Sequence, residues 1–314
     1  MTIKRILCLI CAVSLMLTVT ACSAEKTEHN GSEKISVVTT AFPEYDFCRQ
    51  VAGETAEITM LLLPGEEVHS FDPTPRDILA IKNADVFVYG GGESDSWVNA
   101  ILGEDAQKMN CVSLMEAIEN SNRELETNQH SHGTHEHEEY DEHVWTSPVN
   151  AAVIAQAIAQ ALIKADPSND EVYSANCRNY IEKLNALDAQ FREITNSAKR
   201  NTLVFADRFP LLYFAREYNL ECLSVFPGCA AETEANPKTL ADIISKVESE
   251  KIPVVFKIEM SNNSMAKTVS NQTGAEILTF YSCQTVSKDD FEAGETYLSL
   301  MQRNVEALKT ALDY

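Results

Sequence analysis

The chain contains seven histidines, and their spacing gives the clearest indication of chemistry in the sequence. An imidazole near neutral pH is largely unprotonated and is a good donor to zinc, copper, nickel or cobalt, whereas calcium and magnesium prefer oxygen donors. A flexible histidine run beside acidic residues binds such ions weakly and at several points. One short acidic stretch therefore indicates auxiliary metal capture, although a disordered polar loop with no role is the alternative. Its histidines are His130, His132, His135 and His137, and His143 follows them.

His69 stands apart from this cluster, in Glu67-Val68-His69-Ser70-Phe71-Asp72-Pro73-Thr74-Pro75. It follows a predicted strand and precedes a predicted helix that starts with a cap, a proline and an early acid. That places His69 at the carboxyl end of a strand, where open α/β sheets bind their ligands. A lone histidine is more often structural, so position alone makes His69 a candidate ligand and no more.

The elements that position these side chains are short apolar runs alternating with helical patterns. The runs are near-continuously apolar, as in strands that are buried on both faces. Such alternation predicts parallel sheets with right-handed crossovers. Strands are expected at residues 35–40, 57–63, 85–89 and 111–114, and again at 203–206, 222–226, 254–258 and 276–280. Helices are expected at 43–51, 74–83, 147–165, 211–218, 237–249, 264–272 and 294–312.

Residues 169–198 are expected to form one long helix, because apolar residues recur at three- and four-residue steps and neither proline nor glycine interrupts them. At about 1.5 Å per residue it would span more than about 40 Å. The sequence therefore predicts an α/β fold of two lobes, each with a mostly parallel four-stranded sheet flanked by helices. The lobes would be residues 35–167, with a histidine-rich loop at 119–142, and 200–314, joined by a rigid linking helix at 168–199. One site would lie between them, beyond the carboxyl ends of the strands.

The first residues predict export. Lys4 and Arg5 precede a short uncharged apolar run that ends Val19-Thr20-Ala21-Cys22, which is typical of a secretory signal over residues 1–21. The ending resembles a bacterial lipobox, in which Cys22 would be lipidated; an ordinary signal peptide with a chance cysteine is the alternative. Residues 22–34 are polar and are expected to form a tether. The mature protein would then lie outside the cytoplasm, attached to the cell membrane by its lipid.

The net charge of −22, from 47 acidic and 25 basic residues, argues against nucleic-acid binding, because phosphates need a basic surface. It fits a soluble protein that works near cations and fits equally well an acidic surface kept for solubility. We expect the protein to be a monomer. None of the six cysteines after Cys22 is spaced Cys-x-x-Cys, so a zinc finger is not supported. Outside the cytosol disulfides can form, and the preferred pair is Cys229 with Cys283, in loops that flank the expected site.

Three stretches together resemble the zinc- and manganese-specific solute-binding proteins of ABC transporters. The segment from Glu67 to Pro75 is similar to the family's first ligand motif, a histidine followed by x-aromatic-x-Pro-Thr-Pro. Glu142-His143-Val144-Trp145-Thr146-Ser147-Pro148 is similar to the second, and an acidic histidine-rich loop precedes it in the family's zinc members. The segment from residue 294 to 304 resembles the terminal helix. The similarity covers residues 35–312 and implies that His69 and His143 bind the metal.

The sequence departs from the family pattern at the other two ligands. Asp207 stands where the family has a histidine after the first strand of the second lobe; a carboxylate can bind zinc or manganese, but Asp207 would also suit a helix cap. Tyr281 aligns with the acid that follows the family's last strand, and a tyrosine is a poor zinc ligand unless ionised. Tyr281, Cys283, water or a loop histidine are therefore the candidates for the fourth ligand.

The resemblance implies a binding protein that captures zinc, or alternatively manganese, and delivers it to the permease of an ABC transporter. The histidine loop would raise the local supply of metal, and His69, His143 and Asp207 would close around one ion with little lobe motion. An exported zinc hydrolase with a bound water at these ligands is a second hypothesis. The chain has neither H-E-x-x-H nor G-x-S-x-G, and no general base can be named, so we expect no enzyme. A surface adhesin or metal buffer is the third.

Overall fold

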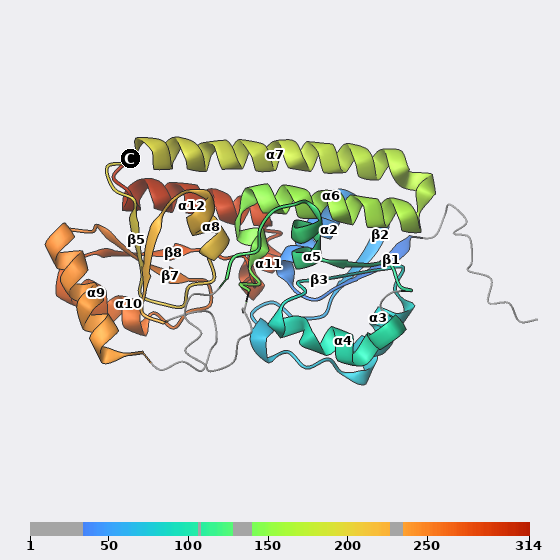
Figure 1. Ribbon diagram of the computed structural model, residues 1–314, viewed down its shortest axis with the longest axis horizontal. Coiled ribbons are helices and arrows are strands. Elements are labelled where there is room, and N and C mark those ends of the chain that lie inside the picture. The colour runs from blue at the N-terminus through green and yellow to red at the C-terminus, as the bar shows by residue number, and fades with distance from the viewer. Residues whose placement is uncertain (1–33, 106–107, 128–139, 227–234) are drawn as a thin grey trace, which may run out of the picture. The chain divides into compact units, whose positions relative to one another are not determined.

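Two parallel four-stranded sheets frame the computed structural model, which describes residues 34–105, 108–127, 140–226 and 235–314 (Figure 1). The first sheet has the order β2-β1-β3-β4 and the second the order β6-β5-β7-β8, so the two halves repeat one arrangement. This confirms the predicted fold class. The strands of the first sheet are β1 Ile35–Thr39, β2 Ala56–Met60, β3 Val86–Tyr89 and β4 Cys111–Ser113. Those of the second are β5 Thr202–Phe205, β6 Glu221–Ser224, β7 Val254–Ile258 and β8 Glu276–Phe280.

The long helix α7, Asp170–Ser197, runs past both sheets (Figure 1) and contacts α2, α6 and α12. At 28 residues and about 1.5 Å per residue it is about 42 Å long. Its buried side chains recur every three or four residues along one stripe. They join a single core cluster that also contains strand residues of both sheets, such as Val37 and Phe256. Residues 34–314 accordingly form one unit, and the predicted lobe boundaries stay a prediction.

The remaining helices flank the sheets. They are α2 Phe42–Ala52, α3 Pro75–Asn83, α4 Ser96–Leu102, α5 Leu114–Asn120, α6 Pro148–Ala165, α8 Leu212–Glu217, α9 Pro237–Glu250, α10 Ser264–Thr273, α11 Lys288–Glu292 and α12 Tyr297–Ala311. The sequence analysis missed α4, α5 and α11, which are only five to seven residues long and too short for a periodic pattern to stand out. The final helix, predicted to start at residue 294, starts three residues later, at Tyr297, because Thr296 is its N-cap and forms a capping box with Ser299.

By length and composition, α6 is the one helix in the described part of the chain that could cross a membrane. Its apolar character has another cause within this fold. Ile154, Ile158 and Leu162 are fully buried, and the helix packs closely against α7 and α2. Such packing is typical of the core helix of a globular unit.

Several predictions lie outside the described residues. They concern the signal segment, Cys22, the tether, the four loop histidines and Cys229. An isolated antiparallel bridge joins Thr127 to Tyr140 and so brings the two flanks of the histidine stretch side by side. Cys283 is a fully buried free thiol among the described residues, and its pairing with Cys229 stays a prediction.

Candidate metal centre

His69, Glu142 and His143 meet beyond the carboxyl ends of the first sheet, where His69 lies within the short 3-10 helix η1 Val68–Ser70 and His143 is the N-cap of a second one, η4 Val144–Thr146. Each of the three side chains offers one ligand atom, and these atoms all lie within 4.8 Å of one another. The centroids of the two imidazole rings are 5.7 Å apart. Two imidazoles and one carboxylate form a donor set of the kind that holds zinc with one position open.

His69 is held by contacts at both ring nitrogens. Its Nδ1 lies 2.7 Å from the Ser94 hydroxyl and 3.1 Å from Glu142 Oε1. Its Nε2 lies 3.0 Å from the amide nitrogen of Gln284. An amide nitrogen only donates, so in this arrangement Nε2 accepts and the ring proton lies on Nδ1, where the carboxylate can accept it. The lone pair of Nε2 thus faces the second half of the chain.

His143 is buried and oriented by Asp141. The Asp141 Oδ1 atom accepts hydrogen bonds from the backbone N–H of His143 at 2.9 Å and from its Nδ1 at 3.0 Å. The start of α6 fixes the backbone here, because Ser147 caps the helix and the Asn150 amide donates to the Val144 carbonyl. A carboxylate bound to one ring nitrogen fixes the tautomer and leaves the other nitrogen, Nε2, for a metal.

Glu142 depends on the glycine turn after β3. A Cβ at Gly92 would lie 2.2 Å from Glu142 Oε2 and 2.3 Å from its Cβ, so only glycine lets the two segments come this close. This glycine turn therefore makes room for the glutamate. The backbone N–H of Ser94 donates to Glu142 Oε2 at 3.0 Å, and its hydroxyl donates to Oε1.

Glu142 is a charged carboxylate at neutral pH. Burial acts to raise its pKa, but the hydrogen bond from His69, the charge of His143 and the hydrogen bonds from Ser94 outweigh burial. Together they lower the pKa of Glu142 to about 2. The sequence analysis missed this residue, and its position directly before His143, in a motif already identified, is the signal that could have found it.

The other predicted ligands have contacts of their own. Asp207 is buried, and its two oxygens accept hydrogen bonds from the backbone N–H groups of Arg208 at 2.9 Å and Ile258 at 3.2 Å. The group formed by the two histidines and Glu142 does not include it. The Tyr281 hydroxyl accepts from Arg303 at 3.2 Å, and burial raises the pKa of the Cys283 thiol well above its ordinary value. The structure thus brings together two of the three predicted ligands.

The second half of the chain reaches the site through Gln284, which the sequence analysis did not identify. Two further contacts cross between the halves nearby: Arg208 pairs with Glu67 at 2.9 Å, and the backbone N–H of Gly65 donates to Thr285 at 3.2 Å. The Gln284 side chain contacts His69 Nε2, and an amide carries an oxygen that can bind a cation. No sequence pattern marks a glutamine as a ligand, which explains why it was missed.

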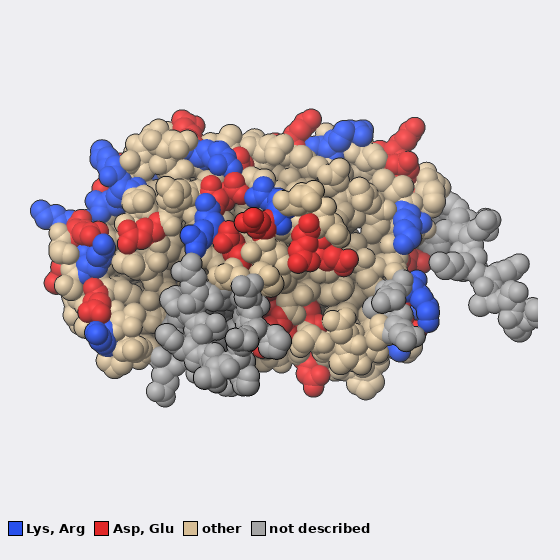
Figure 2. Space-filling view, in the orientation of Figure 1, with Lys and Arg blue, Asp and Glu red and all other residues tan. Residues whose placement is uncertain are grey.

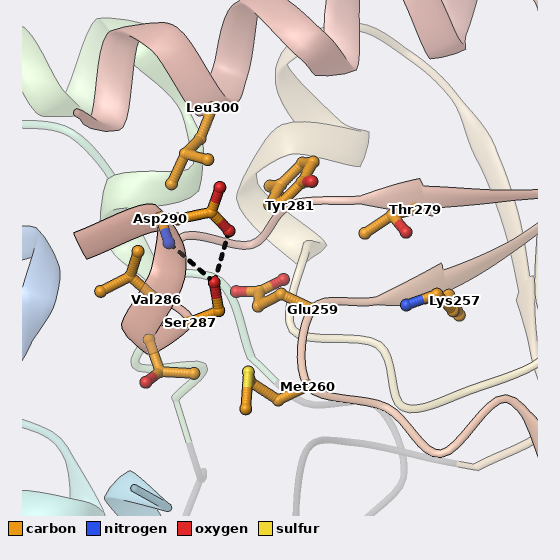
Figure 3. Close-up of a pocket in the computed structure, with 10 residues that line it drawn as sticks. Lys257, Glu259, Met260, Thr279, Tyr281, Val286, Ser287, Asp290 and Leu300 are labelled. Carbon is orange, nitrogen blue, oxygen red and sulfur yellow. Dashed lines mark hydrogen bonds between the residues drawn. The ribbon is translucent and has the colours of Figure 1, made fainter. Parts of the chain in front are cut away.

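Two cavities of about 170 Å³ each lie beside these contacts. One is lined by Glu67, Arg208 and Gln284, and Gln284 contacts His69. Figure 3 shows the other, in which the Ser287 hydroxyl donates to Asp290 at 2.6 Å and the side chains of the histidine site take no part. In Figure 2 acidic side chains gather near the middle of the face shown, with basic side chains beside and above them and further basic ones at both ends. A cation would approach the middle of this face favourably.

Comparison with known proteins gives concordant results. The family model described as ZnuA, zinc-uptake complex component A, periplasmic, matches residues 37–311. The zinc-binding lipoprotein AdcA of Streptococcus pneumoniae is 31% identical over 314 residues, 99% of this chain and 61% of that protein. The chain thus spans about three fifths of the length of that relative.

One further protein and one solved domain match over nearly their whole length. The high-affinity zinc uptake system protein ZnuA of Bacillus subtilis is 30% identical and is covered to 94%, as is this chain. The crystal structure of the Zn(II)-bound ZnuA-like domain of Streptococcus pneumoniae AdcA superposes with a TM-score of 0.74 at 29% identity, covering 90% of this chain and 100% of that domain. These matches confirm the resemblance that the ligand motifs indicated.

Proposed function

The chain belongs to the ZnuA family of periplasmic zinc-uptake components, and from this membership we propose that it captures a zinc ion outside the cytoplasm and delivers it to the permease of an ABC transporter. The observation that carries the proposal is the convergence of His69, Glu142 and His143, each with a ligand atom within 4.8 Å of the others. Two imidazoles favour zinc over manganese, which prefers oxygen donors.

The proposed ligands are His69, His143 and Glu142, with the amide oxygen of Gln284 or a water in the fourth position. Gln284 could present its oxygen after rotation of the amide, because the oxygen and nitrogen occupy equivalent positions. Asp207 is the less favoured ligand. To reach the ion it would have to give up the hydrogen bonds from Arg208 and Ile258, and a buried carboxylate that loses such partners is destabilised.

The finer parts of the proposal concern location and supply. The protein would be anchored to the cell membrane through lipid on Cys22 and would act as a monomer. His130, His132, His135 and His137 would collect metal before transfer to the central site. The name of the Streptococcus pneumoniae relative as a lipoprotein supports the anchor. Mass spectrometry of the protein extracted from membranes would test lipidation, because Cys22→Ala should abolish the added mass.

The protein would transport zinc without catalysing a reaction. A zinc hydrolase needs a general base beside the bound water, and in the proposed site Glu142 is a ligand rather than a free base. A hydrolase would turn over ester or peptide substrates and would lose that activity on chelation. A binding protein would show no turnover, and zinc would raise its melting temperature. Zinc-dependent turnover that disappears in His143→Ala would contradict the proposal.

The central test is zinc titration by calorimetry with a competing chelator, on protein that lacks residues 1–21. His69→Ala, His143→Ala and Glu142→Gln should each weaken tight zinc binding by at least tenfold, because each removes a ligand or its charge. His29→Ala is the matched control and should leave the affinity unchanged, since it removes a histidine from the predicted tether. Unchanged tight binding in the His69→Ala/His143→Ala double variant would remove the proposed site.

A further inference from the structure

A second group of carboxylates lies behind Glu142. Glu44 and Asp95, together with Glu142, line a cavity of about 20 Å³. This volume is about enough to hold one water molecule or one ion of similar size. Glu44 is 2% exposed and Asp95 is 7% exposed. One oxygen of each, Oε2 of Glu44 and Oδ1 of Asp95, is buried without a hydrogen-bond partner. Buried polar atoms of this kind are rare in folded proteins and require an explanation.

The remaining oxygens of the two carboxylates are already bound by the backbone. The N–H of Gly91 donates to Asp95 Oδ2 at 3.1 Å, and backbone N–H groups at the start of α2 hydrogen-bond to Glu44. A Cβ at Gly90 would lie 3.1 Å from Asp95 Oδ2 and 3.5 Å from Glu44 Oε1. The two carboxylates therefore converge beside Gly90, each with one oxygen satisfied and one left over.

Positive charge is missing from this pocket. No lysine or arginine is among the described residues that line it. Burial and the charge of Asp95 raise the pKa of Glu44 to about 8, and burial raises the pKa of Asp95 to about 6. Buried carboxylates that lie close together must be neutralised by protons or by a cation. No hydrogen bond joins Glu44 to Asp95 among the described contacts, so a proton shared directly between them is not the arrangement observed.

We propose that Glu44 and Asp95 bind one small, oxygen-preferring cation, sodium or calcium, in a second site behind the zinc centre. Thr40 also lines the cavity, and its hydroxyl, which donates to the Val88 carbonyl at 3.5 Å, would be the third oxygen donor. Calcium takes such oxygen donors at about 2.3–2.6 Å in flexible geometry, whereas magnesium keeps several waters and needs more room than about one water volume. Zinc would stay with the imidazoles. The inference does not rest on the proposed transport function, because its two carboxylates are not the proposed zinc ligands.

The test measures thermal melting and calorimetry of the metal-free protein with calcium chloride, sodium chloride or magnesium chloride, at ionic strength held constant with tetramethylammonium chloride. The measurements are made on wild type and on the His69→Ala/His143→Ala variant, which lacks both histidines of the proposed zinc centre. Calcium or sodium should raise the melting temperature by a few degrees in wild type and in this variant, and magnesium should not. Glu44→Gln and Asp95→Asn should each abolish the shift, whereas Glu54→Gln, at an exposed position, should retain it.

Any one of three results would overturn the second site. The first is that neither cation shifts the melting temperature of wild type, and the second is that the shift persists in Glu44→Gln. The third is that the shift disappears in the double histidine variant, which would show that it belongs to the zinc centre. A Glu44→Gln protein that melts higher than wild type while wild type ignores both cations would show that protons neutralise the pair. Because Asp95→Asn tests the same site from another element, failure of one variant to fold leaves the other to decide.

Discussion

Removing Asp141 should weaken zinc binding although Asp141 is not a proposed ligand. Its Oδ1 atom accepts from both the ring Nδ1 and the backbone N–H of His143, at 3.0 and 2.9 Å, and both side chains are nearly fully buried. Loss of such a partner typically costs about 10–100-fold in metal affinity, which corresponds to about 1.4–2.7 kcal/mol at 25 °C. We expect Asp141→Ala to fall in this range. Asp141→Asn, which keeps an acceptor oxygen but loses the charge, should fall between Ala and wild type.

Calorimetric titration with a competing chelator measures the effect directly. Each variant must first melt cooperatively in the absence of metal, because Asp141 is buried and its carbonyl accepts from the Tyr213 hydroxyl at 2.8 Å. Asp105→Asn removes an exposed carboxylate and serves as the control with unchanged affinity. A folded Asp141→Ala protein that binds zinc within twofold of wild type would refute the reasoning. The ring of His143 would then either be held by other contacts or play no part in metal binding.

Three further predictions concern stability and pH. Tyr297→Phe removes the hydroxyl that donates to the Trp145 carbonyl at 2.8 Å. It should lower the free energy of unfolding, measured in urea, by about 1–3 kcal/mol, because that carbonyl stays buried without its partner. Phe191→Ala, on the buried stripe of α7, should cost about 3–5 kcal/mol by the same measurement. Burial acts to raise the pKa of Glu217, but hydrogen bonds and charge from Arg192 and a second arginine lower it. The Glu217 carboxylate therefore contributes to the free energy of unfolding at pH values above its ordinary pKa of 4.5. This contribution is lost as the pH falls through the lower pKa that Glu217 has in the folded protein. The difference in unfolding free energy between wild type and Glu217→Gln should be constant from pH 6 to 8 and shrink below about pH 4.5; a difference that grows in acid would contradict this.

Buried parallel strands and the long helix could be predicted from sequence because their signals extend over many residues. The strand at 254–258 is confirmed at both ends, and α7 begins and ends within one residue of the predicted helix. The short helices were missed for the opposite reason. For Ser96–Leu102, seven residues give only about two turns, so tertiary packing rather than periodicity decides its conformation.

The site could be predicted only in part. His69 and His143 belong to local motifs whose residues lie next to one another in the chain, so the sequence alone predicts both as candidate ligands, and the structure brings them together. Gln284 and Glu44 carry no local signature, because the roles proposed for them depend on which loops the two sheets bring together. Asp207 shows the converse limit. A residue at the carboxyl end of a strand can point towards the ligand or bind neighbouring backbone amides, and in the structure Asp207 binds the amides.

All three proposed ligands come from the first half of the chain, and this has a consequence for how metal would leave. The second half contacts this region through Gln284 and through Ser282, whose carbonyl accepts from the indole N–H of Trp145 at 3.0 Å. The ring centroid of Trp145 lies 5.4 Å from that of His143. The helix α7 packs along both halves within one core. Wide separation of the two halves would therefore expose a large apolar area, and exposing it costs about 25 cal/mol per Å². A small shift of the second half would withdraw Gln284 and admit water without breaking any of the three ligand bonds. Release would therefore need a competing ligand or a proton at the histidines, and opening alone would not suffice.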